Sequence, residues 1–554
     1  MKKVILNLLL SLTLSSSLFA NSSYTDFMQS DFKVTLTWLE EKPKSSAKDF
    51  FILQYLNSEN LSFLDAKRAY DMRKGNNATL EKAFKQKFNE KLSSEDRFCY
   101  NASILELKST NPKCIALGLS SLKKASELSK NDLHFFISKL DSYPTLKKDL
   151  QILANNSVFE ALKIGGAKEF LRVFFAVSNN YRNRFLNKNI DLNFLNELAK
   201  EKDFEKFLRY AIYDKDLKNI QKSFDNLNSN QTLNSTILFM LGINAINNKD
   251  LSKANSFFSQ SYDKSYLSQD KDKSLYWKYL SSNDISFLNE LASSRDVNIY
   301  SLYAKELLNI DISNIVYNLQ LQDGTSKYNI YNPFLWDEVT SDTKKNLDET
   351  KLQNYKNLLS YKDTEAHLAF ILERFEKYKT HYFITPYKDI LKKYDIDKQV
   401  LIYSIARQES RFIPSAISFS SAQGMMQIMP FLSKDIAKEL NQAYNIYEQF
   451  IPEKNIEFAS YHLDKLNKQF DNNPLFVAYA YNGGAGYTRS QLKKGLFKEK
   501  NRFEPFLSME MISYNETKDY GKKVLTNYYI YNNYLNSENK ISLSTILQNL
   551  VSPY

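Results

Sequence analysis

Apolar side chains recur along much of this chain with the spacing of one face of an α-helix. They are separated by 3, 4 and 3 residues between Leu217 and Leu227, and by 3, 4 and 4 residues between Leu251 and Tyr262. A short polar turn, 213–216 or 247–250, separates each of these segments from an earlier helical-period segment. The pattern predicts two antiparallel helix pairs.

The two predicted pairs are offset by 34 residues, because Asp216 and Leu217 in the first correspond to Asp250 and Leu251 in the second. This offset is the period of tetratricopeptide-type helical repeats. A single pair of segments that match at this offset is weak evidence for a repeat, because chance spacing of apolar residues produces such a match as well. We therefore expect an irregular α-superhelix in preference to a regular array.

Glycine and proline are scarce in this sequence. There are 12 glycines in 554 residues, against an average usage of ~7%, and only six of them precede Phe383. Between Lys113 and Asn332 the only proline is Pro144. Because so few turn residues leave little room for hairpins or bulges, we expect an all-α fold, and a chain of this length requires more than one domain.

The N-terminus has the layout of a secretory signal peptide. Lys2 and Lys3 precede an apolar run from Val4 to Leu14, and small residues in 15–20 provide a cleavage region. The run is too short to span a bilayer as a helix, and no later segment has a long uncharged apolar run. A buried N-terminal helix is the alternative. We expect an exported protein without stable membrane insertion.

Cys99 and Cys114 are the two cysteines of the chain, and in an oxidising compartment a pair this close in sequence is a disulfide candidate. Two separately buried thiols are the alternative. The formal net charge is +11. Nucleic-acid binding is not expected, because export argues against it and the charge is not segregated. A mildly basic surface is as compatible with another anionic polymer as it is with nucleic acid.

Three stretches of the last third carry the candidate chemistry. Residues 405–430 read IARQESRFIPSAISFSSAQGMMQIMP, which places one acid, Glu409, between an apolar helical run and a Met-rich turn. Residues 480–484 read AYNGG, and residues 510–524 read EMISYNETKDYGKKV. In this order and at this spacing they resemble the motifs of the soluble lytic transglycosylases, enzymes that cut the glycan strands of bacterial peptidoglycan.

The resemblance implies a three-part architecture. A U-shaped α-superhelix is closed into a ring by a linker helical domain, and a lysozyme-like α-helical catalytic domain follows. Helical patterning breaks near residue 380, so we place the signal peptide at 1–20, the superhelix at 21–335, the linker at 336–382 and the catalytic domain at 383–554. The resemblance also implies a periplasmic protein whose partners are peptidoglycan glycan strands and muropeptides.

Glu409 is the expected catalytic residue. Cleavage of a glycosidic bond needs a proton on the leaving oxygen, and burial keeps a carboxyl protonated near neutral pH. Most glycosidases also use a second carboxylate, but residues 410–430 contain none. The family implies that Glu409 acts first as acid and then as base on the muramic acid C6 hydroxyl, which closes a 1,6-anhydro ring. A second carboxylate from elsewhere in the fold remains an alternative.

Other positions are carried over from the family one at a time. Each has an ordinary structural interpretation as well, as a turn serine, a surface glutamine or a core methionine. Gly521 stands where the family usually has Val, and Gln423 stands where Ser is common. The residues implied to bind substrate or support the site are Ser410, Ser418, Gln427, Met429, Tyr481, Asn482, Glu510 and Tyr520.

Competing chemistries find little support in the sequence. The four histidines are scattered, with no His-Glu-x-x-His motif and no cysteine cluster, so we expect no metal site and no cofactor. Two other functions stay open. One is a muramidase on the same fold, in which water replaces the C6 hydroxyl. The other is a non-catalytic peptidoglycan-binding scaffold, against which the intact Glu409, Gln427 and Tyr481 argue.

Overall fold

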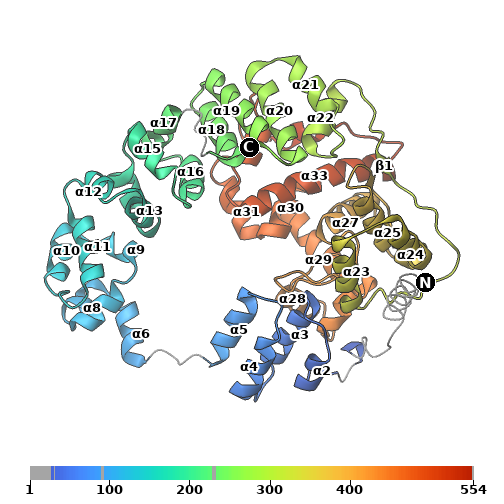
Figure 1. Ribbon diagram of the computed structural model, residues 1–554, viewed down its shortest axis with the longest axis horizontal. Helices are drawn as coiled ribbons and strands as arrows, with labels where there is room; N and C mark the ends of the chain where they lie inside the picture. The colour runs from blue at the N-terminus through green and yellow to red at the C-terminus, as the bar shows by residue number, and fades with distance from the viewer. Residues whose placement is uncertain (1–26, 30–31, 89–92, 228–232, 552–554) are drawn as a thin grey trace, which may run out of the picture. The chain divides into compact units, whose positions relative to one another are not determined.

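A computed structural model describes residues 27–29, 32–88, 93–227 and 233–551, and it is built almost wholly of α-helices (Figure 1). Within these residues the only sheet consists of two short parallel strands, β1 (Ile315–Val316) and β2 (His381–Tyr382). The predicted all-α fold is confirmed. The predicted signal peptide, 1–20, lies outside the described residues.

The chain folds into two compact units that do not follow sequence order. Unit 1 combines 1–89, 292–500 and 514–554, and unit 2 combines 90–291 with 501–513. The domain boundaries expected from the sequence divide the chain into consecutive segments, and they stay a prediction.

Unit 2 is a succession of short helices in which each helix packs mainly on its neighbours along the chain, as in an α-solenoid. Its helices are α6 (Ser94–Asn101), α7 (Ile104–Lys108), α8 (Pro112–Gly118), α9 (Leu122–Ala125), α10 (Lys130–Ile137), α11 (Pro144–Ala154), α12 (Val158–Ile164), α13 (Ala167–Ala176), α14 (Asn179–Tyr181), η2 (Arg182–Leu186), α15 (Leu192–Leu198), α16 (Phe204–Tyr213), α17 (Lys218–Ser223), η3 (Phe224–Asn226), α18 (Ser235–Asn247), α19 (Leu251–Lys264), α20 (Ser268–Ser282), α21 (Ile285–Ala292) and α32 (Phe506–Glu510).

The two predicted helix pairs are present as α16–α17 and α18–α19, which confirms the periodicity argument. The turn before α19 shows how the local sequence ends one helix and begins the next. Lys249 adopts a left-handed conformation with φ +65°, and the Asp250 side chain accepts a hydrogen bond from the Lys253 N–H at 3.0 Å. A side-chain acceptor at this position satisfies a backbone donor that the first turn of the helix leaves unpaired.

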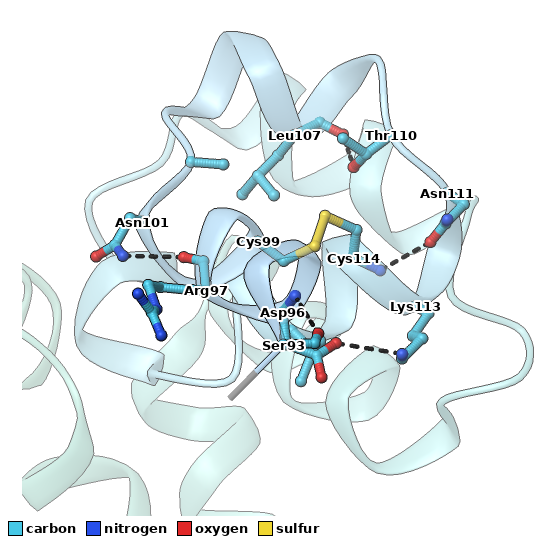
Figure 2. Close-up of a disulfide and its surroundings, with 12 residues drawn as sticks. Ser93, Asp96, Arg97, Cys99, Asn101, Leu107, Thr110, Asn111, Lys113 and Cys114 are labelled. Carbon is cyan, nitrogen blue, oxygen red and sulfur yellow. Dashed lines mark hydrogen bonds and ion pairs between the residues drawn. A yellow bond between two sulfur atoms is a disulfide. The ribbon is translucent and has the colours of Figure 1, made fainter. Parts of the chain in front are cut away.

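Cys99 and Cys114 form a disulfide between α6 and α8 (Figure 2), as the sequence predicted. Asn111 caps α8 by accepting a hydrogen bond from the backbone N–H of Cys114 at 2.9 Å. Gly118, at the end of α8, lies so close to α6 that a Cβ there would be 2.8 Å from the carbonyl oxygen of Cys99. The bond therefore joins two helices that already pack tightly.

Unit 1 contains the last third of the chain and the first helices. Its elements besides β1 and β2 are α2 (Leu36–Glu40), α3 (Ser46–Leu56), α4 (Phe63–Asp71), α5 (Ala78–Phe88), α22 (Ile299–Leu307), α23 (Pro333–Lys345), α24 (Glu349–Leu359), η4 (Lys362–Thr364), α25 (Glu365–Phe375), α26 (Lys388–Leu391), α27 (Ile396–Glu409), α28 (Pro430–Glu439), η5 (Ile446–Phe450), α29 (Pro452–Gln469), α30 (Pro474–Gly483), α31 (Ala485–Leu492), α33 (Asn515–Leu535) and α34 (Leu543–Asn549).

The long helix α33 is central in unit 1, because it packs against both α27 and α30 (Figure 1). These three helices carry the acid and two of the three sequence motifs. A separate aromatic cluster joins the first helices of the chain to η5: Phe51 on α3 stacks on Tyr447, and Phe27 contacts Phe450. Among the described residues, no helix has the length and apolar character needed to cross a bilayer.

Candidate active site

Glu409 is the last residue of α27, a helix whose side chains from Val400 to Arg407 are all buried. The helix begins at Asp395, whose side chain accepts a hydrogen bond from the Lys398 N–H. Ser410 caps the carboxyl end of the helix, and the next two residues, Arg411 and Phe412, adopt left-handed conformations that redirect the chain. Glu409 itself is only partly buried. A rigid, buried helix thus presents this carboxyl at its carboxyl end.

Burial raises the pKa of Glu409 to about 7, and two side chains of α33 modify this effect. Tyr520 donates a hydrogen bond to Oε1 at 2.7 Å, which favours the carboxylate and lowers the pKa. Glu516 carries a like charge and raises the pKa. Because burial holds the pKa of Tyr520 well above 10, its phenol stays a donor at neutral pH.

Ser410 organises the turn that faces the end of α27. Its Oγ donates to the carbonyl of Met425 at 2.7 Å and accepts from the Ile413 N–H at 3.0 Å. The Met-rich turn is fixed from its other side by Asn455, which accepts from the Met426 N–H at 2.7 Å. Ser410 therefore ties the helix end to the Met-rich turn.

Gly424 is required in this turn for two reasons. Its φ of +77° is one that other residues rarely adopt, and a Cβ there would lie 2.2 Å from the carbonyl oxygen of Gln449. Gln423, which stands beside it in place of the family's usual serine, is fully buried and donates to the carbonyl of Ile446 at 3.1 Å. The longer side chain reaches a partner that a serine could not.

Tyr481 and Asn482 lie at the end of α30 and connect the Met-rich turn to α33. The Tyr481 hydroxyl donates to the carbonyl of Met426 at 2.7 Å. Asn482 accepts from the Thr517 hydroxyl at 2.7 Å and donates to Glu516 Oε1 at 3.4 Å. The charge of Glu409 contributes to the raised pKa of Tyr481, after the larger effect of burial. Tyr481 of the second motif and Tyr520 of the third therefore both lie close enough to interact electrostatically with Glu409.

Ser418, Gln427 and Met429 lie in the loop that follows Glu409. Ser418 Oγ accepts from the Ala422 N–H at 2.9 Å, and Gln427 donates to the carbonyls of Ala416 and Gly424. Met429 directly precedes α28 and is partly buried. These contacts stabilise the loop, and the substrate contacts implied by the resemblance stay predictions.

Glu510 and Gly521 differ in their relation to this site. Glu510 is buried at the end of α32, which belongs to unit 2. Gly521, which replaces the family's usual valine, packs against Tyr479 of α30, and a Cβ at this position would lie 2.1 Å from the Tyr479 ring. The large aromatic ring therefore occupies the space that a valine side chain would need.

The sequence analysis did not anticipate one group of charged residues next to α27. Glu373 of α25 is 3% exposed and pairs with Arg407 of α27 at 2.9 Å and with Arg411 at 3.2 Å. Arg407 also lies over the ring of Phe383 at 3.8 Å. Burial lowers the pKa of Arg407 to about 10, an indication of the cost of placing its charge there. These arginines stand two residues before and two residues after Glu409.

No cluster of potential metal ligands occurs among the residues that the structure describes.

The sequence analysis did not single out Glu516 as a neighbour of Glu409, although Glu516 belongs to the third motif. Its spacing of four residues from Tyr520 on one helix places both on the same face, and this spacing is the signal that could have revealed it.

Residues 386–503 match the transglycosylase SLT domain family. The match covers about a fifth of the chain. The SLT domain so defined contains Glu409, the Met-rich turn and Tyr481, and it ends before Tyr520. Helix α33 therefore completes the surroundings of Glu409 from outside the matched segment.

Relatives with similar sequences share only a part of their length with this chain. The soluble lytic murein transglycosylase of Escherichia coli is 34% identical over 144 residues, or 25% of this chain and 22% of the relative. The putative soluble lytic murein transglycosylase of Haemophilus influenzae is 35% identical over 138 residues, or 24% and 22%. The match thus spans about a fifth of the length of these relatives.

A solved structure aligns over a longer region. The 70 kDa soluble lytic transglycosylase of Escherichia coli covers 96% of this chain, and 92% of its own length is matched, at 18% identity and a TM-score of 0.45.

Proposed function

We propose that this protein is a lytic transglycosylase that cleaves peptidoglycan. Its SLT domain contains Glu409, and the relatives that match a quarter of the chain are named soluble lytic murein transglycosylases. The observation that carries the proposal is the partly buried carboxyl of Glu409, held by the Tyr520 phenol at the end of a rigid helix. This arrangement suits one group that both donates and accepts a proton.

In the first step Glu409 acts as the general acid. A pKa of about 7 leaves a large fraction of the carboxyl protonated at neutral pH. Tyr520 engages Oε1, so the proton is delivered from Oε2 to the oxygen between N-acetylmuramic acid and N-acetylglucosamine. The bond from C1 to that oxygen breaks, and positive charge develops at C1, which the N-acetyl oxygen of the substrate shares.

In the second step the resulting carboxylate acts as the base. It removes the proton of the muramic acid C6 hydroxyl as that oxygen attacks C1, which closes the 1,6-anhydro ring and returns Glu409 to its protonated form. A nucleophile tethered in the same sugar has an effective molarity on the order of 10⁵ M or more. Such a nucleophile outcompetes water without any second carboxylate.

A hydrolytic muramidase is the second candidate, and Glu516 is the observation that favours it. Its carboxylate is close enough for its charge to raise the pKa of Glu409. A hydrolase uses a second carboxylate either as nucleophile or as base for water. In the lytic mechanism, by contrast, Glu516 tunes the acid and holds Asn482.

We infer supporting roles for the remaining residues. Tyr481 and Asn482 line the glycan cleft, and Ser410 orients the end of the catalytic helix. Ser418, Gln427 and Met429 contact sugar or acetamido groups, and Glu510 supports the surrounding packing. Action on peptidoglycan also requires export to the periplasm, which the segment 1–20 would direct.

Digestion of purified sacculi, followed by mass spectrometry of the released muropeptides, tests the proposal. Products that end in 1,6-anhydro-N-acetylmuramic acid, one water lighter than hydrolysed products, support the lytic mechanism. Reducing ends as the dominant species would reassign the protein to the muramidases. The Glu516→Gln variant adds a second criterion, because loss of all cleavage in this variant supports hydrolysis and retained cleavage supports the lytic route.

A further inference from the structure

A cavity of about 610 Å³ lies at the amino-terminal end of α30, away from the acid. Pro474 lines the cavity, and Tyr481 of the active site is seven residues further along the same helix, about 10 Å at 1.5 Å per residue. None of the residues assigned to glycan cleavage is among those that line it. The cavity is therefore separate from the site around Glu409.

The inner wall of the cavity is mainly apolar and comes from five parts of unit 1. The side chains are contributed by the end of α29, the start of α30, the segment around the end of α31, Tyr528 of α33, and the region of α34. The rings of Phe476 and Phe497 pack with centroids 5.1 Å apart. The other large apolar residues of the wall are mostly buried: Phe470, Leu492, Leu496, Ile546 and Leu550.

The rim has a different chemistry, because it is exposed and mainly basic. Arg489, Lys493 and Lys498 line the opening, against one acid, Asp471. The guanidinium of Arg489 donates to the neutral side chain of Gln469 at 2.6 Å. Within the described part of the chain, no carboxylate forms an ion pair with Lys493 or Lys498. The rim therefore carries positive charge that an anionic ligand would neutralise.

We propose that this cavity binds an anionic amphiphile with a single apolar chain, of the class of medium-chain fatty carboxylates. The chain would lie against the buried aromatic and aliphatic wall, and the carboxylate would meet the basic rim. The volume falls within the range of small-molecule sites in proteins. A peptide fits less well, because Asn473 already caps α30 and Gln469 already accepts from Arg489.

The proposal is independent of glycan cleavage, and a binding experiment on the full-length protein tests it. Sodium dodecanoate, below its critical micelle concentration, is titrated into the protein in a calorimeter. Dodecyl maltoside supplies a chain of the same length without charge, and acetate supplies the charge without the chain. We expect saturable one-to-one binding of dodecanoate only, with a dissociation constant on the order of 10–100 μM.

Two sets of exposed lysines provide matched variants. Replacement of both rim lysines, Lys493→Glu with Lys498→Glu, is expected to weaken dodecanoate binding at least tenfold. Lys494→Glu is the control, since Lys494 donates to Gln491 at 3.2 Å and does not line the cavity. It should leave the affinity unchanged.

Four outcomes would overturn the proposal. These are absence of saturable dodecanoate binding, equal binding of dodecyl maltoside, an unchanged affinity in the double lysine variant, and an equal loss of affinity in the control. Binding of an acidic dipeptide such as acetyl-Phe-Glu in place of dodecanoate would reassign the cavity to peptide ligands, and it too would refute the amphiphile.

Discussion

Two side chains of α33 act in opposite directions on the carboxyl of Glu409. The Tyr520 hydrogen bond lowers its pKa and the charge of Glu516 raises it, while burial has the largest effect. The resulting pKa of about 7 lies near the pH at which a group that works as acid and then as base is most effective. Individual residues on this helix therefore have separable effects on pH dependence.

Glu409→Gln is expected to abolish cleavage and preserve the fold. The amide is similar in shape but cannot donate the required proton, so turnover on sacculi should fall by roughly 10²–10⁴. Circular dichroism and a glycan-binding assay would establish that the variant is folded and binds. Retention of more than about a hundredth of wild-type turnover would show that another residue is the acid.

The pH profile of kcat/KM provides a second prediction. Activity requires protonated Glu409 in the free enzyme, so it should fall as pH rises through about 7. Glu516→Gln removes the like charge, so the pH at which kcat/KM falls should be lower than in the wild type. Tyr520→Phe removes the hydrogen bond that favours the carboxylate, so in this variant kcat/KM should fall at a higher pH. Shifts in the same direction in both variants would contradict this account.

The raised pKa of Glu409 also has a consequence for stability. Above pH 4.5 the folded state binds more protons at this site than the unfolded state, so the folded state loses stability as pH rises from 4.5 towards 7. The cost is at most about 3 kcal/mol at pH 8. Glu409→Gln should therefore be more stable than wild type at pH 8 and equally stable at pH 4, as measured by urea unfolding. An equal difference at both pH values would contradict the linkage.

At the level of helices, the disulfide and the packing of α30 on α33 show two ways in which pairs of elements are held together. The Cys99–Cys114 bond joins α6 and α8 in unit 2. Gly521 allows α33 to approach Tyr479 of α30 closely in unit 1. The first is a covalent constraint on the unfolded chain, and the second is a packing constraint on the folded one.

Removal of the disulfide should lower stability without loss of catalysis. The 15-residue separation of the two cysteines corresponds to a loop-entropy effect of ~3 kcal/mol. The double variant Cys99→Ser with Cys114→Ser should fold and cleave sacculi but unfold at a lower temperature. Reduction of the wild-type protein should reproduce the shift. Labelling of both thiols in the unreduced, denatured protein would refute the bond.

At the level of the whole molecule, the boundary predicted near residue 383 lies within a compact unit. Residues 292–500 belong to unit 1 as one segment. Glu373, which precedes the boundary, pairs with Arg407 and Arg411, which follow it. Strand β2 ends at the boundary and pairs with β1. Residues before 383 therefore help to support α27, the helix that ends at Glu409.

A fragment that begins at Phe383 tests this conclusion. From the sequence we expect such a fragment to be much slower on sacculi and less affected on short soluble muropeptides, because it retains every catalytic motif. The structure predicts instead a comparable loss on both substrates. The fragment lacks Glu373, the ion-pair partner of Arg407, and Tyr382, whose carbonyl accepts from Arg407, so α27 loses part of its support.

The matched comparison uses the full-length chain. Glu373→Gln removes only the counter-charge and should lower the unfolding temperature and slow cleavage of both substrates. Glu349→Gln, at an exposed position of α24, should change neither. A fragment that is folded by circular dichroism and fully active on soluble muropeptides would contradict the role of Glu373.

The sequence alone was sufficient for the features that depend on neighbouring residues. The period of apolar residues in 204–262 predicted the helix pairs that the structure contains. Three short motifs that resemble those of the soluble lytic transglycosylases identified Glu409 as the candidate. The short separation of Cys99 and Cys114 made their disulfide an expectation. Helix formation, turns and short loops are local, so their signals lie within a few residues of each other.

The tertiary structure alone decided the features that depend on distant residues. The pKa of Glu409 depends on burial and on Tyr520, which lies 111 residues further along the chain. The pairing of Glu373 with Arg407, the close packing of Gly521 on Tyr479 and the cavity beside α30 likewise combine segments that no sequence pattern links. Desolvation and Coulomb interactions depend on distance in space, and only the packed helices determine which groups lose water together.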